Sequence, residues 1–150
     1  MTMPTNTLLA LQGAIPDPTA ATGIAAILDR GTSGGLGIGY TGGGATVTQL
    51  TNRATGVTIN ALCGTITTIN TSLAAQASAV FVVTNSKVAI GDVVVLSMQS
   101  GSVALNTICV VSAVAAGSFS ITVINANAAA GIAETGAILI NFAVIKAVSA

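Results

Sequence analysis

Few side chains in this sequence could carry out acid–base chemistry. The 150 residues include four Lys or Arg, four Asp or Glu and no His, and His is the usual general base near neutral pH and a frequent metal ligand. A catalytic carboxylate pair would have to come from Asp17, Asp29, Asp92 and Glu134. Their neighbours are typical of turns and loops, such as Gly91 before Asp92. We therefore predict that the protein is not an enzyme.

The two cysteines, Cys63 and Cys109, are poor candidates for a nucleophile. Neither adjoins a Lys or Arg that would lower its pKa, and the chain has no histidine to accept the thiol proton. No basic residue precedes the short apolar stretch at residues 8–11, so we expect folding in a reducing cytoplasm, without a disulfide. Both thiols are predicted to be free and buried.

One glycine motif resembles a nucleotide-binding loop. Residues 37–42 match G-x-G-x-x-G, but a dinucleotide site needs a strand before the motif and a helix after it. Here glycines precede it and a strand pattern follows, which favours a flexible segment. The chain also lacks a phosphate-binding loop with Lys-Ser or Lys-Thr and the acidic run of a calcium loop. No cofactor and no metal site are expected.

Charge and hydropathy narrow the possible partners. Charged residues make up 5% of the chain and the formal net charge is zero, where a soluble domain has roughly 25% charged residues. A basic surface for nucleic acid is therefore excluded. Mean hydropathy is high at +0.88, but no window reaches the ~18 consecutive apolar residues of a membrane-spanning helix. We expect neither nucleic acid nor a membrane as partner.

Residues 1–45 have the composition of an extended arm. All three prolines lie here, followed by a glycine-rich stretch at residues 31–44 that offers little side-chain burial. The arm also contains apolar residues that the small β core has little reason to carry, and we predict that they bind a partner surface or a sister chain. These residues are Leu8, Leu9, Leu11, Ile15, Ile24, Ile27 and Leu28. The spacing of the last three also allows one short helical turn.

Residues 46–150 predict an all-β domain. Val, Ile and Thr dominate, and turn signals recur about every ten residues, as in an antiparallel β-sandwich or jelly-roll-like fold. Residues 118–123 alternate cleanly, with Phe119, Ile121 and Val123 on one face. The expected strands are residues 46–50, 57–60, 65–70, 79–84, 93–98, 107–113, 118–124 and 138–148.

Several of these strands are apolar on both faces. An antiparallel sheet in a lone domain usually leaves one face in water, so a strand that is apolar on both faces indicates a subunit interface. The longest such strand is at residues 138–148, and we predict that its side chains form the interface of a homotrimer. The proposed contact residues are Ile138, Ile140, Phe142 and Val144.

Several segments of the β region resemble a module of tailed-bacteriophage virion proteins. The segments are VTQLTNRATGVTIN at residues 47–60 with LCG at 62–64, VTNS at 83–86, VAAGSFSI at 114–121 and NFAVIKAV at 141–148. The likeness as a whole extends over roughly residues 37–150. The resemblance implies a capsid decoration (cement) protein or a small head or tail structural protein, with no enzymatic activity.

We therefore expect a protein that is made in the host cytoplasm and ends on the capsid surface. As a homotrimer it would bind the phage major capsid protein and stabilise the shell, with the arm as the clamp. The alternative is a tail or fibre protein for host attachment. Such a protein would expose aromatic residues to stack on sugars, and this chain has only Tyr40, Phe81, Phe119 and Phe142.

Overall fold

The computed structural model describes residues 28–30, 36–38 and 44–147. The chain divides into two units, Met1–Thr41 and Gly42–Ala150. In the first unit, strands β1 (Leu28–Arg30) and β2 (Leu36–Ile38) form an antiparallel ribbon. The helical turn expected around Leu28 is not formed at that residue, which begins β1, while Ile24 and Ile27 lie outside the described residues. Part of the glycine-rich stretch at residues 31–44, which was expected to be flexible, is the strand Leu36–Ile38.

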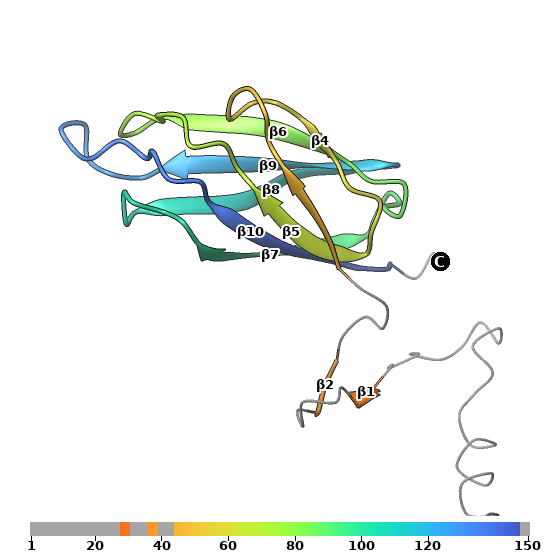
Figure 1. Ribbon diagram of the computed structural model, residues 1–150. Coiled ribbons are helices and arrows are strands. Elements are labelled where there is room, and N and C mark those ends of the chain that lie inside the picture. The colour runs from red at the N-terminus through yellow and green to blue at the C-terminus, as the bar shows by residue number, and fades with distance from the viewer. Residues whose placement is uncertain (1–27, 31–35, 39–43, 148–150) are drawn as a thin grey trace, which may run out of the picture. The chain divides into compact units, whose positions relative to one another are not determined.

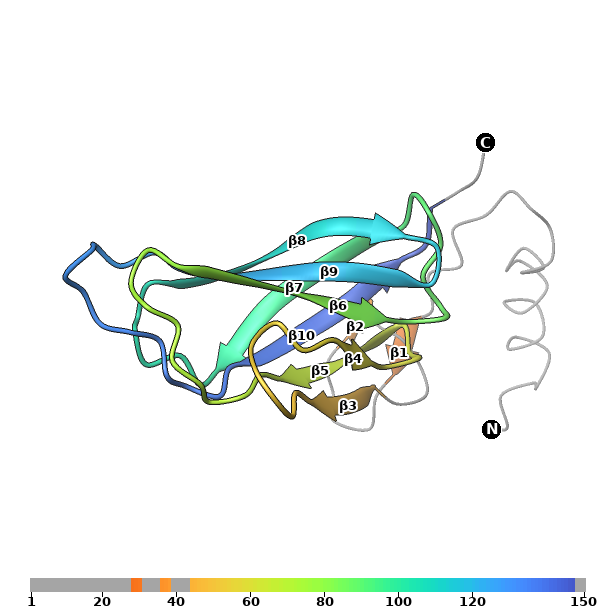
Figure 2. The same cartoon turned by 90° about the horizontal axis from the view of Figure 1, so that it is seen from above.

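The second unit is a β-sandwich. Its strands form two four-stranded sheets, in the orders β3-β5-β10-β7 and β4-β6-β9-β8, which lie face to face in Figures 1 and 2. The described residues include no helix. The predicted sandwich is therefore confirmed. The strands are β3 (Ala45–Thr48), β4 (Val57–Thr58), β5 (Cys63–Thr67), β6 (Ser78–Thr84), β7 (Val93–Ser100), β8 (Thr107–Ala115), β9 (Ser118–Asn125) and β10 (Leu139–Ile145).

The two sheets are mixed rather than wholly antiparallel. The central pairings, β5 and β7 with β10 and β6 and β8 with β9, are antiparallel as expected. The short edge strands β3 and β4 pair in parallel with β5 and β6. Parallel pairing normally needs a helical crossover. Here the chain instead crosses to the other sheet after each of β3, β4 and β5. As a result, β4 connects the parallel pair β3 and β5, and β5 connects the parallel pair β4 and β6.

Alternating apolar residues of the central strands fill the space between the sheets. Phe119 and Val123 on β9 face the core, as the alternation predicted, and the hydroxyls of the same strand lie on the other face. On β10 every second residue points inward. The rings of Phe119 and Phe142 meet across the core with their centroids 5.4 Å apart, a separation at which tilted aromatic pairs attract. This core joins the sheets and leaves their outer faces to the surroundings.

Candidate functional site

The residues predicted as the trimer interface lie inside one subunit. Ile138, Ile140 and Val144 have no exposed surface and Phe142 is 3% exposed. They are part of the core between the two sheets. Their side chains therefore fill the interior of the sandwich and present no surface to a neighbouring subunit. The sequence pattern was apolar on both faces, and the structure assigns these four to the inner face.

The predicted arm residues fall almost entirely outside the described part of the chain. Leu8, Leu9, Leu11, Ile15, Ile24 and Ile27 lie outside it, and Leu28 is the first residue of β1.

An apolar outer face lies on the β4-β6-β9-β8 sheet. Val80 and Val82 on β6 and Ile108 and Val110 on β8 are each 40–49% exposed. Val80 and Val110 flank Thr122 of β9 from opposite sides. The side chains therefore form two apolar rows on either side of a row of hydroxyls. We call these four residues the outer apolar face.

A second apolar area lies on the outside of the other sheet. Val93 and Val95 of β7 and Ile145 of β10 are 48–55% exposed, and Val93 is paired with Ile145. Further along the same face, Thr65 donates a 2.7 Å hydrogen bond to Asn141. Both sheets thus combine exposed β-branched apolar residues with short polar ones.

A charged cluster is buried at one end of the sandwich. Arg53, in the β3–β4 connection, is 4% exposed. Its guanidinium donates to the carbonyl oxygens of Thr71, Glu134 and Gly136 and to the Thr68 hydroxyl, over 2.6–3.3 Å. Burial lowers the pKa of Arg53, while attraction to the Glu134 charge opposes this shift. One side chain thereby ties the β3–β4 connection to the β5–β6 and β9–β10 connections.

The Glu134 carboxylate completes this cluster and is fully buried. It accepts hydrogen bonds of 2.5 Å from both the Ser102 and Thr107 hydroxyls, and further bonds of 2.7–3.3 Å from the backbone N–H groups of Val103, Ala104 and Gly136. Burial alone would raise the pKa of Glu134, but these donors outweigh burial and lower it to about 2.

This arrangement suits a structural role better than a catalytic one. Both oxygens of Glu134 are occupied by donors from the chain itself, and a carboxylate that is ionised and fully hydrogen-bonded is a weak base. The sequence interpretation treated Glu134 as one of four carboxylates in turns or loops and did not single out Arg53. The available signal was their rarity, because the chain has only eight charged residues.

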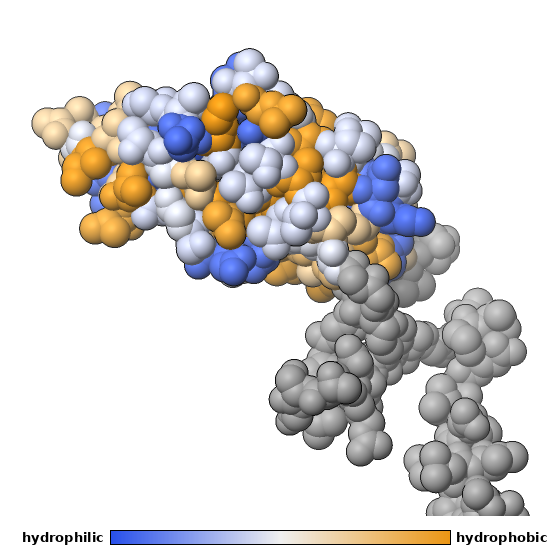
Figure 3. Space-filling model, viewed as in Figure 1, coloured by the Kyte–Doolittle hydropathy of each residue, from blue (hydrophilic) through white to orange (hydrophobic). Residues whose placement is uncertain are grey.

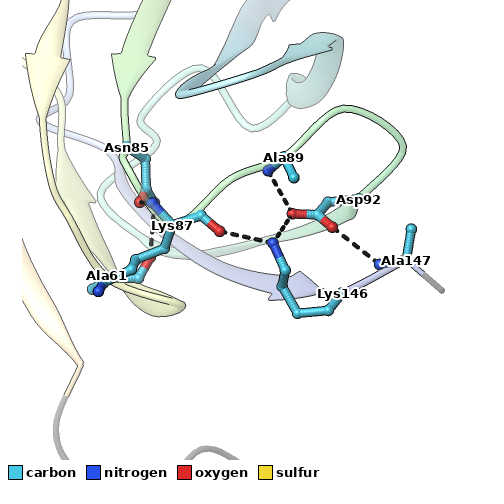
Figure 4. A network of polar contacts seen from close by, with 7 residues as sticks. All are labelled: Ala61, Asn85, Lys87, Ala89, Asp92, Lys146 and Ala147. Carbon is cyan, nitrogen blue, oxygen red and sulfur yellow. Dashed lines mark hydrogen bonds and ion pairs between the residues drawn. The ribbon is translucent and has the colours of Figure 1, made fainter. Parts of the chain in front are cut away.

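A second polar cluster lies at the opposite end of the sandwich (Figure 4). Asp92, in the turn before β7, forms an ion pair with Lys146, which follows β10. Its carboxylate also accepts bonds from the N–H groups of Ala89 (2.7 Å) and Ala147 (3.0 Å). The hydrogen bond from Lys146, helped by these two N–H groups, lowers the pKa of Asp92 to about 2. The cluster fastens the end of β10 to the β6–β7 turn.

The two thiols are free, as predicted, but only half-buried. Cys63 is on β5 and Cys109 on β8, in different sheets. Cys109 packs against the core from an edge strand. Since neither thiol is fully buried, the prediction of burial was wrong for both. Burial raises the pKa of Cys109 to about 11. That shift makes it a poor nucleophile at neutral pH.

Other kinds of site were also sought. Within residues 28–30, 36–38 and 44–147, no three His, Cys, Asp or Glu side chains lie close enough together to hold a metal ion. No helix in the described part of the chain is long and apolar enough to cross a membrane. Comparisons with protein-family models, curated proteins and solved structures found no match to this chain.

Proposed function

We propose that this protein is a non-enzymatic structural subunit of a tailed-bacteriophage particle that decorates the capsid as a homotrimer. In this role it is assembled in the host cytoplasm, binds the major capsid protein on the outside of the head and stabilises the lattice. The proposal rests on the resemblance of the β region to phage virion modules and on the surface chemistry of the sandwich.

The observation that carries the proposal is the outer apolar face. Four β-branched side chains, 40–49% exposed, stand on β6 and β8, on either side of β9, without a charged neighbour on that face. Exposed apolar patches of this kind mark sites of protein association in soluble proteins. Threefold symmetry requires two different contact patches on each subunit. The outer apolar face and the Val93–Val95–Ile145 area on the other sheet supply two such patches.

Decoration would stabilise a shell by mass action. A subunit that binds the assembled lattice, and not the dissociated capsid protein, lowers the free energy of the assembled state by RT ln(1 + [L]/Kd) for each site. Here [L] is the concentration of free subunit and Kd its dissociation constant from the lattice. Trimers that contact several capsid subunits at once gain further from effective concentration. A low exposed charge suits such a permanent contact, since few ions must be desolvated when it forms.

The deciding experiment is to locate and count the chain in purified particles of the phage that encodes it. Quantitative gel analysis is expected to give hundreds of copies per particle, and cryo-electron microscopy should place a trimeric density on the head surface. A few to a few dozen copies with density on the tail would instead establish the tail or fibre alternative. If particles contain no such chain, the structural role is wrong.

A further inference from the structure

One end of the sandwich is a group of four connections fastened together. The β3–β4, β5–β6, β7–β8 and β9–β10 connections are joined there through Arg53 and Glu134, whose hydrogen bonds reach all of them. We call this the loop end. The backbones also approach closely, since a Cβ on Gly136 would lie 1.7 Å from the Gly101 carbonyl oxygen. The buried cluster therefore fixes the shape of this end before any partner arrives.

Three exposed apolar side chains project from this fixed base. Leu105 is 87%, Ile132 62% and Val103 49% exposed. Asn127 joins their loops, because its side-chain amide donates to the carbonyl oxygens of Ala104 (2.8 Å) and Ile132 (3.4 Å). Figure 3 shows hydrophobic residues gathered at this end of the sandwich, on the left of the view. We call Val103, Leu105 and Ile132 the apolar tips.

The backbone at Leu105 is unusual. Its φ is +63°, in the left-handed region that bulky side chains rarely adopt. Backbone held in such a region is a common feature of binding and catalytic sites, where surrounding structure enforces it. Here the enforcement comes from Glu134, which binds the N–H groups of Val103 and Ala104 just before it. The consequence is that a leucine side chain is held out into the surroundings.

The loop end carries no exposed charge in the described part of the chain. The exposed charged side chains described by the structure are Lys87 and Lys146, and both belong to the opposite end, where the Lys146 ammonium donates to the Lys87 carbonyl oxygen. Arg53 and Glu134 are buried. A phosphate-rich or otherwise charged partner would find no complementary ion at the loop end. An uncharged, apolar partner surface fits it.

We infer that the loop end docks onto the capsid by inserting the apolar tips into an uncharged apolar pocket on the major capsid protein. This inference rests on the proposed function and names the part of the sandwich that meets the shell. Apolar side chains that project from a rigid base fit a concave protein pocket, and little conformational freedom is lost when they bind.

The test measures binding of the full-length chain to undecorated capsids of the encoding phage by co-sedimentation. Leu105→Asn is the informative variant because Asn tolerates the left-handed conformation, so the loop should keep its shape. Ile90→Asn is the matched control, since Ile90 is 80% exposed but lies in the turn at the opposite end. Leu105→Asn is expected to weaken capsid binding by about 10- to 30-fold, and Ile90→Asn to leave it unchanged.

The outcomes separate this inference from the proposed function. If the unaltered chain does not sediment with capsids, decoration itself is wrong. If it does, but Leu105→Asn binds equally well, the loop end is not the docking site. Two parallel measurements test whether the apolar tips bind a partner other than the capsid. Loss of self-association in Leu105→Asn by light scattering would assign the tips to a sister subunit, and binding to phosphatidylcholine vesicles that Leu105→Asn abolishes would assign them to a lipid surface.

Discussion

Arg53 and Glu134 are 81 residues apart in the sequence, yet an Arg53 guanidinium nitrogen donates a 3.1 Å hydrogen bond to the Glu134 carbonyl oxygen. The guanidinium thus binds the backbone of Glu134, while the Glu134 carboxylate binds the β7–β8 connection and the start of β8. Each charged residue holds together loops that are far apart in the sequence. The stability of the loop end therefore depends on two charges in a chain that has very few.

Glu134→Gln is expected to destabilise the sandwich by about 3 kcal/mol. The substitution keeps the size of the side chain but removes the charge that opposes Arg53, and its NH₂ group would face the N–H donors of Val103 or Gly136. Urea unfolding followed by circular dichroism would measure the change. Thr46→Val, at an exposed position on an edge strand, serves as a control with little expected effect. A loss below about 0.5 kcal/mol for Glu134→Gln, similar to an ordinary surface change, would contradict this role.

Stability is expected to fall as the pH is lowered from about 4.5 to about 2. The pKa of Glu134 is lowered from 4.5 to about 2 by folding, and that of Asp92 from 3.8 to about 2. The unfolded chain therefore binds more protons in this window, so the contribution of both groups is complete above it and is lost on acidification. Urea midpoints at pH 7, 4 and 3 would show the decline. The Glu134→Gln chain should show a shallower decline, and an equally steep one would mean that Glu134 does not contribute.

The strands of the β-sandwich could be predicted from the sequence, because the alternation of apolar and polar residues along a strand is a local property. All eight expected strands of the β domain are present, with ends shifted by a few residues. For example, the strand expected at residues 65–70 begins at Cys63 and ends at Thr67, because Thr68 turns inward to bind Arg53 and Ile138. The parallel edge pairs depend on which strands meet across the sandwich, and no local pattern specifies that.

The sequence predicted the candidate surfaces less well. When a strand is apolar on both faces, the pattern does not indicate which face lies inside, and the inner set of β10 was therefore taken for an interface. The Arg53–Glu134 cluster brings together four connections that are separated in the sequence. Predicting it would have required the topology. What could have been noticed is that Glu134 is the one acidic residue in residues 93–150.

Substitutions on the two faces of the sandwich should separate folding from assembly. Phe142→Ala removes a core ring that contacts Phe119 and is expected to cost about 3–5 kcal/mol of unfolding free energy. Val110→Asp places a charge on the outer apolar face, where the side chain is 40% exposed. It should leave the subunit folded but convert trimers into monomers. Light scattering and circular dichroism distinguish the two effects. A folded Val110→Asp trimer would exclude this face from the interface.

The thiol of Cys109 is expected to react slowly in the folded protein. With its pKa raised from 9.0 to about 11, about one molecule in a thousand carries the thiolate at pH 8, roughly 100-fold fewer than for a cysteine with a pKa of 9.0. The Cys63→Ala chain contains Cys109 alone, so its alkylation by iodoacetamide, followed by mass spectrometry, reports this site. Rapid reaction without denaturant would contradict the burial seen here. The absence of any reactive thiol in urea without reductant would reveal an oxidised cysteine.

Deleting residues 2–30 is expected to leave a folded sandwich with weaker capsid binding. The core is assembled from residues 57–144, so the circular dichroism spectrum and the urea midpoint should be close to those of the full chain. The apolar residues from Leu8 to Leu28 are proposed to clamp a neighbouring capsid subunit. Removing one of two linked contacts should lower the affinity for undecorated capsids by tenfold or more. Unchanged affinity would show that residues 2–30 are not a clamp, and failure to fold would show that the sandwich depends on them.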